Sequence, residues 1–257
     1  MKKFFAIFSL VALSLTACDK GVDTNEAKGK GSVAFKVGET TEVVDTRANV
    51  SCTTPAAEDF SLRIEGVDSS YAADYDNIAI FNENNYLVEG QYKATVSAGS
   101  LAEEGYDKAM FVGSKEFAVV ARQHTDVEIT ATIANALVKV EVTENFTNYF
   151  VGGHSLKLTT AAGNEFDVTA QTEPIFFAPG AFTISGTATK QPNQSGKGGV
   201  EVTLPEYKNE NADAQTLYTV KLDVENVGGA TLTITLNETL VESIDIEQEL
   251  NDNAEEA

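Results

Sequence analysis

Residues 90–98 read Gly-Gln-Tyr-Lys-Ala-Thr-Val-Ser-Ala. In this stretch Tyr92, Ala94 and Val96 alternate with polar residues, so an extended chain carries them on one face. A helix would scatter the same residues around its axis, and aromatic and β-branched side chains suit a pleated surface. The stretch therefore predicts a β-strand with one face buried.

The same alternation recurs along the chain on both sides of this strand. Short segments are separated by Gly, Asn, Asp and Pro, and almost nothing repeats at helical spacing. The clearest further segments are residues 33–37, 60–64, 127–133, 138–142, 182–184, 200–202, 218–224 and 232–236. The chain is therefore predicted to be all-β.

An internal repeat indicates two domains. Residues 180–188 read Gly-Ala-Phe-Thr-Ile-Ser-Gly-Thr-Ala and align with residues 90–98 through the glycine, an aromatic residue two positions later, and the alternation after it. Repeats of this size are typical of tandem modules. We therefore expect two β-sandwich domains, over residues 31–147 and 148–247.

The N-terminus predicts export and anchoring. Lys2 and Lys3 precede an apolar run over residues 4–15, which is too short for a permanent transmembrane helix but typical of a signal peptide. Residues 15–18, Leu-Thr-Ala-Cys, resemble the bacterial lipoprotein box. The resemblance implies a signal peptide over residues 1–17 and covalent lipid such as palmitate on Cys18. The alternative is an ordinary secretory signal with an incidental cysteine.

Composition limits the partners. The chain holds 39 acidic and 18 basic residues, and its formal net charge is −21. Such a charge repels nucleic acid and anionic lipid head groups, so a nucleic-acid partner is excluded. Residues 18–30, which are mostly Gly, Lys, Asp, Asn and Glu, are expected to form a flexible tether, and residues 248–257 an acidic tail.

No residue pattern predicts catalysis or a metal site. Once Cys18 carries lipid, Cys52 has no disulfide partner, and it is expected to be a small loop residue because no base or metal ligand lies near it in sequence. His124 and His154 fall in different expected domains, and no metal-ligand pair has useful spacing. Nucleophile elbows and phosphate loops are absent from the sequence. We expect no enzymatic activity and no cofactor beyond the lipid.

Tyrosines gather with Asn and Asp between residues 71 and 86. Tyr71, Tyr75 and Tyr86 are candidate glycan-binding residues, because their rings could stack on a sugar whose hydroxyl groups bond to neighbouring polar side chains. Bound calcium is a weaker alternative, since the oxygen ligands lack a recognised spacing. A structural alternative is that the rings fill a sandwich core while the asparagines make turns.

Two glycine-led segments resemble the strand entry of transthyretin-like sandwiches in secreted proteins, Pro-x-Gly-x-Tyr-x-Val-x-Ala. They are residues 87–98 and 178–184. Glycine makes the tight turn, and the aromatic residue then packs between the sheets. The resemblance implies a transthyretin-like or immunoglobulin-like scaffold and is poorly specific for function.

Nearly the whole mature chain resembles the fimbrillin-like lipoproteins of Bacteroides-type anaerobes, and more closely an uncharacterised lipoprotein domain family of the same organisms. The residues that carry the resemblance are 15–18, 31–37, 45–48, 60–64, Gly90 with Tyr92, and 134–140. It implies an adhesin-like or fimbria-related subunit, lipid-anchored and surface-exposed on the outer membrane, with other surface subunits or glycans as partners.

In fimbrillins an arginine-specific protease removes the leader together with the first strand, and another subunit's strand fills the groove. By resemblance the cut would fall between Arg47 and Ala48 and release residues 33–37. The alternative is that Arg47 is an ordinary solvated loop residue. Residues 244–246 are short and run into acidic residues, which suits a donor strand poorly. A carbohydrate-binding surface lipoprotein that does not polymerise is therefore the alternative function.

Overall fold

The computed structural model describes residues 28–41, 50–190, 199–223, 232–234 and 244–246. Strands dominate, with short helical turns between them, which confirms the all-β sandwich class. The elements in chain order are β1 (Lys30–Thr40), η1 (Ala57–Asp59), β2 (Ser61–Gly66), β3 (Ala72–Tyr75), α1 (Ile78–Asn82), β4 (Tyr86–Val88), β5 (Gly90–Ala98), β6 (Gly105–Tyr106), β7 (Phe111–Val119), β8 (His124–Ile133), β9 (Ala136–Val142), α2 (Glu144–Tyr149), β10 (His154–Thr160), β11 (Glu165–Asp167), β12 (Ile175–Phe177), β13 (Gly180–Thr189), β14 (Glu201–Thr203), β15 (Tyr207–Ala212), β16 (Leu217–Leu222), β17 (Leu232–Ile234) and β18 (Ile244–Ile246).

The first unit is a seven-stranded sheet in the order β3-β2-β5-β7-β8-β1-β4. β1 runs parallel to β8 and pairs at its start with β4 in the antiparallel sense. The inward-facing residues of these strands form one buried apolar cluster together with Phe60 and with Ile78 and Phe81 of α1. Burial of such side chains supplies the main driving force for folding.

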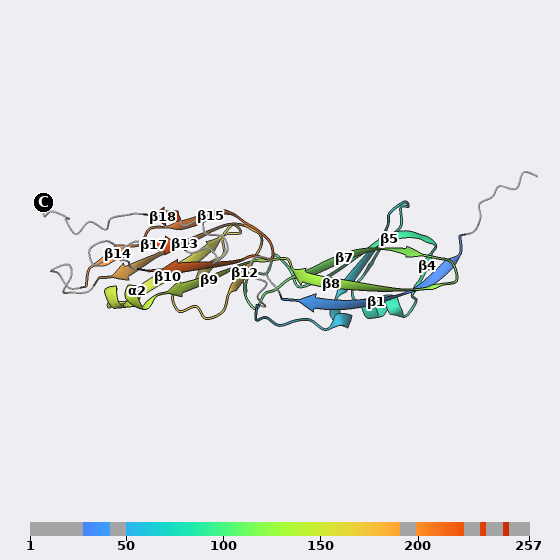
Figure 1. The fold of residues 1–257 in the computed structure, drawn as a ribbon, viewed down its shortest axis with the longest axis horizontal. Helices are drawn as coiled ribbons and strands as arrows, with labels where there is room; N and C mark the ends of the chain where they lie inside the picture. Colours follow the sequence, from blue (N-terminus) through green and yellow to red (C-terminus); the bar gives the residue numbers. More distant parts are fainter. Residues whose placement is uncertain (1–27, 42–49, 191–198, 224–231, 235–243, 247–257) are drawn as a thin grey trace, which may run out of the picture.

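The second unit combines a five-stranded sheet, in which β11, β10, β13 and β14 follow one another and β15 also pairs with β13, with a sheet in the order β16-β9-β12-β6. A second buried cluster lies between them and includes Phe146 and Tyr149 of α2. Figure 1 shows the two units following each other along the long axis, with the chain entering at the free end of the first unit.

The repeated sequence segments occupy matching places in the two units. β5 begins at Gly90 and β13 at Gly180, and both glycines have positive φ angles, as the tight entry requires. β5 lies between β2 and β7, as β13 lies between β10 and β15. The division into two domains stays a prediction; α2 spans residue 148, where the boundary was expected, and packs in the second cluster.

The two clusters divide close to Asn135 instead. Ile133 belongs to the first cluster, whereas Ala136, Val138 and Val140 belong to the second. After β9, Thr143 caps α2 by accepting a hydrogen bond from the backbone N–H of Phe146 at 3.2 Å. β9 is therefore the first strand of the second unit, where its place matches that of β1 in the first.

β7 is the longest strand missing from the sequence prediction. Gly113 interrupts its alternation, and the structure gives the reason: a Cβ atom there would lie 2.6 Å from the carbonyl oxygen of Thr130. A Cβ atom on Gly186 in β13 would likewise clash with the carbonyl oxygen of Ser155. Close approach of neighbouring backbone thus requires glycine inside both strands.

A loop of the first unit joins the two units by adding a strand to a sheet of the second. This loop runs from β5 to β7 and contains β6, which pairs with β12 through Tyr106 opposite Ile175 and Gly105 opposite Phe176. Phe176 in turn packs in the first cluster together with Leu137 of β9. The joint therefore combines backbone pairing with shared apolar burial.

Glu104 and Asn135 hold that loop in place. The Glu104 carboxylate accepts hydrogen bonds from the Thr160 hydroxyl at 2.6 Å, from Asn164 Nδ2 at 2.9 Å and from the Ala178 backbone N–H at 3.1 Å. The buried Asn135 amide accepts from the backbone N–H of Met110 at 2.6 Å and donates to the carbonyl oxygen of Lys108 at 3.4 Å. Both ends of the loop are thus fixed by charged or buried polar groups.

We predict that Glu104→Ala lowers the free energy of unfolding by about 2 kcal/mol, because it leaves three donors without their acceptor. Glu103→Ala is the matched control: its carboxylate makes an exposed ion pair with Lys108, and its loss is expected to cost below about 0.5 kcal/mol. Urea unfolding followed by circular dichroism measures both, since the chain contains no tryptophan. Equal losses in the two variants would contradict this role of Glu104.

Candidate binding groove between the two units

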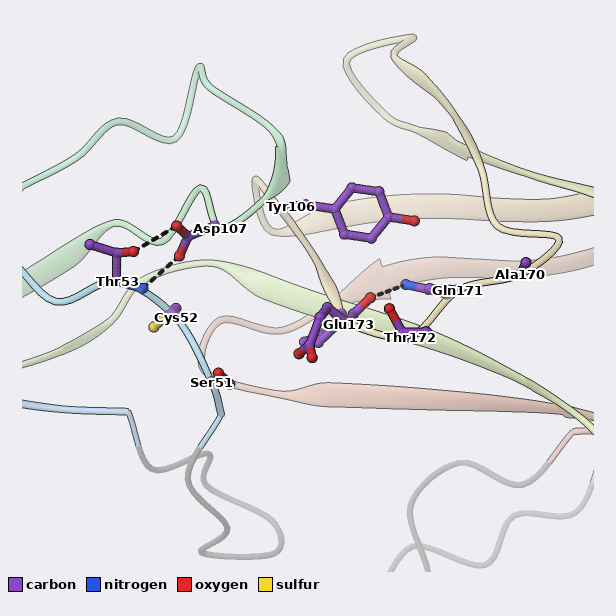
Figure 2. Close-up of a pocket in the computed structure, with 10 residues that line it drawn as sticks. Ser51, Cys52, Thr53, Tyr106, Asp107, Ala170, Gln171, Thr172 and Glu173 are labelled. Atoms are coloured by element: carbon purple, nitrogen blue, oxygen red, sulfur yellow. Dashed lines mark hydrogen bonds between the residues drawn. The ribbon is translucent and has the colours of Figure 1, made fainter.

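A groove of about 710 Å³ lies where the two units meet. Residues 51–53 and 106–107 of the first unit form one wall, and residues 170–174 of the second unit form the other. Figure 2 shows these side chains facing one space from separate segments of chain. The β6–β12 pairing described above sets the position of the walls relative to each other.

Asp107 is fixed on the first wall by Thr53. The backbone N–H and the hydroxyl of Thr53 donate to the two carboxylate oxygens of Asp107 at 2.5 and 2.7 Å. These hydrogen bonds lower the pKa of Asp107, and the bond from the Thr53 backbone has the larger effect. The carboxylate is therefore ionised at neutral pH. Asp107 has a φ angle of 55°, a left-handed conformation that aspartate tolerates better than most residues.

Tyr106, the residue before Asp107, presents an aromatic surface to the same groove. Its backbone is held by pairing with β12, its hydroxyl donates to the carbonyl oxygen of Asp167 at 3.3 Å, and the side chain is 44% exposed. Burial, and secondarily the charge of Asp167, raises the pKa of Tyr106, so the phenol is neutral. The ring is thus fixed at both ends while part of its surface faces solvent.

Gln171 organises the second wall. Its Oε1 accepts from the backbone N–H of Val140 at 2.7 Å, and its Nε2 donates to the carbonyl oxygens of Val138 at 3.0 Å and Glu173 at 2.8 Å. The amide therefore pairs with the edge of β9 beyond the end of β12. Because its own groups are occupied, Thr172 and Glu173 are the polar side chains that this segment offers to a ligand (Figure 2).

Cys52 lies in the groove as a protonated thiol. Burial is the main cause that raises the pKa of Cys52 to about 11, and the charge of Asp107 adds to it. A thiol with this pKa is a poor nucleophile at neutral pH. The prediction of an unreactive loop cysteine therefore agrees with its surroundings.

The groove offers an aromatic face, hydroxyl groups and two carboxylates, those of Asp107 and Glu173. A sugar matches this set, because its C–H face can stack on Tyr106 while its hydroxyl groups donate to the carboxylates. Two carboxylates alone make a weak cation site, and within the described ranges no three His, Cys, Asp or Glu residues gather closely enough to hold a metal ion. The groove is therefore suited to a neutral, hydroxyl-rich ligand.

A comparison with known families shows the family to which the chain belongs. The model of a domain of unknown function, DUF4493, matches residues 29–252. The chain belongs to the DUF4493 family. None of the curated proteins matches it.

Solved structures of proteins from Bacteroides and Parabacteroides show distant similarity to this DUF4493 chain. A Bacteroides eggerthii protein with a suggested role in cell adhesion is 11% identical, with a TM-score of 0.40, and the match covers 85% of this chain and 93% of that one. For a fimbrial assembly protein from Parabacteroides distasonis the identity is 12%, the TM-score 0.38 and the coverage 81% and 96%. A Bacteroides thetaiotaomicron protein with a suggested role in polysaccharide binding is 11% identical, with a TM-score of 0.37. The match covers 82% of this chain and 97% of that one. Identity and TM-score are low in each case, and the functional proposal therefore rests on the chain's own residues.

The tyrosines chosen from the DUF4493 sequence do not line this groove. Tyr71 and Tyr75 are neighbours, and burial followed by a hydrogen bond with Tyr75 raises the pKa of Tyr71. Their rings pack edge-on against Tyr92 and Phe81 of the first cluster. Tyr86 lies on β4, at the opposite end of the strand order from β3, and is exposed. Their role in glycan binding stays a prediction.

The anchor and processing predictions fall on other parts of the chain. Cys18, Arg47 and Ala48 lie outside the described residues. Among the helices that the structure describes, none has the length and hydropathy of a membrane span.

β1 and β8 bring a serine, a histidine and an aspartate together on the first unit. Ser32 Oγ lies 2.9 Å from His124 Nδ1, and Asp126 Oδ1 lies 3.6 Å from His124 Nε2. A catalytic triad needs a well-oriented hydrogen bond between aspartate and histidine, and 3.6 Å is too long for one. Both His124 and Asp126 are more than half exposed, so water competes for these contacts. The constellation therefore serves as a surface contact between two parallel strands.

Sequence reasoning missed Thr53, Tyr106, Asp107 and Glu173. The Thr53–Asp107 contact joins residues 54 positions apart, and the second wall comes from the other unit. Single polar residues in loops carry no periodic signal, so only the folded joint reveals them.

We predict that alkylation of Cys52 in a Cys18→Ser variant is roughly a hundredfold slower at pH 8 than that of an ordinary cysteine, because little thiolate forms below pH 11. The rate is expected to rise with pH toward about 11. Asp107→Asn should speed the reaction at each pH by removing a negative charge near the sulfur. Iodoacetamide labelling followed by mass spectrometry measures the rate, with the urea-unfolded protein as control. Equal folded and unfolded rates at pH 8 would contradict the raised pKa.

Proposed function

We propose that this DUF4493 protein is a lipid-anchored, adhesin-like protein on the surface of the outer membrane, and that it binds a carbohydrate in the groove between its two units. The observation that carries the binding role is that the partly exposed ring of Tyr106 and the carboxylate of Asp107, held by Thr53, line the same groove. The anchor rests on the lipoprotein box at residues 15–18.

The geometry of the molecule fits this arrangement. The chain enters at the free end of the first unit, and the groove lies at the joint, farther along the long axis (Figure 1). A tether from Cys18 would therefore hold the groove away from the membrane, where a surface ligand can reach it. Rigid walls favour binding because less conformational entropy is lost on association.

We predict that Tyr106→Ala weakens carbohydrate binding roughly five- to thirtyfold, because stacking and burial on the ring contribute roughly 1–2 kcal/mol. Asp107→Asn should weaken it as well, by replacing a charged acceptor with a weaker neutral one. The ligand would be found on a glycan array, and its Kd measured by calorimetry. Tyr86→Ala is the control, since Tyr86 lies outside the groove. Loss of binding in Tyr86→Ala with none in Tyr106→Ala would move the site to the tyrosines predicted from sequence.

A fimbria-related role is the second candidate, and β1 is the observation that favours it. β1 is the first described strand and pairs with β8 at nine positions, from Ser32 to Thr40. Val33 and Phe35 are buried in the first cluster. Removal of this strand would leave an apolar gap between β8 and β4 that another subunit's strand could fill. The cut at Arg47 would separate β1 from the rest of the chain.

We predict for this second role that an arginine-specific protease acting on intact cells produces a new N-terminus at Ala48 and a ladder of higher oligomers. Arg47→Lys is the control and should abolish both. N-terminal sequencing and gel electrophoresis without boiling give the two readings. Cleavage that leaves the protein monomeric would support surface exposure and contradict the assembly role. Resistance to the protease until the cells are lysed would contradict the surface location.

A further inference from the structure

Four segments meet at the free end of the first unit, which we call the entry end: residues 28–32, 66–70, 86–91 and 120–124. Backbone hydrogen bonds join them, from Glu89 N–H to Gly29 at 2.8 Å, from Arg122 N–H to Lys30 at 2.8 Å and from Val67 N–H to Gln91 at 2.9 Å. A hollow of about 510 Å³ lies among three of these segments. Figure 1 shows the start of β1 and β4 at this end.

Apolar side chains are exposed on the turns and the edge strand of the entry end. They are Val67 (54% exposed), Tyr86 (59%), Val88 (38%) and Val120 (47%). They come from three segments of chain that are joined through the contacts above. Several exposed apolar residues at one end of a strongly acidic protein indicate a surface that meets a partner.

The charge at the entry end differs from that of the chain as a whole. Its four segments carry three basic residues, Lys28, Lys30 and Arg122, against two acidic ones, Asp68 and Glu89, so their formal charge is 3 − 2 = +1. The complete chain has a net charge of −21. The local charge at this end therefore opposes contact with phosphate groups less than the charge of the chain as a whole does.

We propose that the entry end docks on the lipid surface that holds the acyl chains of Cys18. This inference rests on the lipid anchor of the proposed function. Ten peptide steps separate Cys18 from Lys28, so the tether spans at most about 35 Å. The anchor thus keeps the entry end close to the bilayer at a high effective concentration.

The side chains at this end suit the region of the lipid head groups. Tyrosine prefers the membrane interface, where its ring is buried and its hydroxyl stays hydrated, and Tyr86 is free to adopt this position. Lys28, Lys30 and Arg122 can pair with phosphate groups, and the small apolar residues Val67 and Val88 can enter between head groups without a large cost. Docking would orient the long axis away from the membrane and present the groove outward.

Single tryptophan probes test this proposal, because the chain has no tryptophan of its own. The full lipidated protein carrying Val88→Trp is reconstituted in vesicles of phosphatidylcholine and phosphatidylglycerol, with and without brominated acyl chains. Val151→Trp is the matched control: Val151 is 63% exposed between α2 and β10, in the second unit. We expect bromine to quench the fluorescence of Val88→Trp and to leave that of Val151→Trp unchanged.

The outcomes separate the docking surface from the anchor. The protein could float with the vesicles while neither probe is quenched, or while both are quenched equally. That result would overturn the docking proposal and leave the anchor intact. Protein that remains unbound, and behaves as Cys18→Ser does, would overturn the proposed anchoring on which docking rests. Urea unfolding of each tryptophan variant shows whether the substitution has disturbed the fold.

Charge reversal tests the electrostatic part. Lys30→Glu combined with Val88→Trp should lower the ratio of docked to undocked protein roughly fivefold in anionic vesicles, as expected for loss of a basic residue at a charged surface. Lys208→Glu is the control, because Lys208 is an exposed residue of β15 in the second unit. Equal quenching in the two variants at low salt would show that these charges do not face the lipid.

Discussion

Glu104 belongs to a loop of the first unit, yet all three of its hydrogen-bond donors lie in the second. The same loop supplies β6 to the sheet that contains β9 and β12. Burying a carboxylate without hydrogen-bond donors costs free energy. A sheet edge without a neighbouring strand leaves backbone N–H and C=O groups unpaired. Each unit therefore satisfies polar groups of the other, and the positions of the groove walls depend on this exchange.

The joint explains why the groove is a pre-formed site. Tyr106 is paired through its backbone to β12, Asp107 is fixed by Thr53, and Gln171 holds the opposite segment to β9. Hydrogen bonds between the backbone and a partly buried amide such as that of Gln171 restrict motion more than exposed ion pairs do, which contribute little. The groove can thus keep an aromatic ring partly exposed without letting it collapse onto the core.

The local alternation of apolar and polar residues was enough to predict the sandwich class. Strands such as β5 and β16 bury one face, and their apolar residues therefore recur at every second position. The repeat of Gly90 and Gly180 also located equivalent strands. β7 was not predicted because Gly113 breaks the apolar alternation. Glycine is required there by the close approach of the Thr130 backbone, which is distant in sequence. The groove escaped prediction for a similar reason: its residues share no period and meet only through pairing between units.

The distribution of charge gives the molecule a direction. A net charge of −21 spread over most of the surface opposes contact with phosphate-rich membranes, and within a Debye length each acidic residue adds to that repulsion. The entry end is the place where basic residues offset the acidic ones and where valines and Tyr86 are exposed. An acidic body attached through such an end is pushed away from the bilayer everywhere except at its attachment. In a molecule anchored as proposed, the same charge would therefore help to hold the groove at a distance from the membrane.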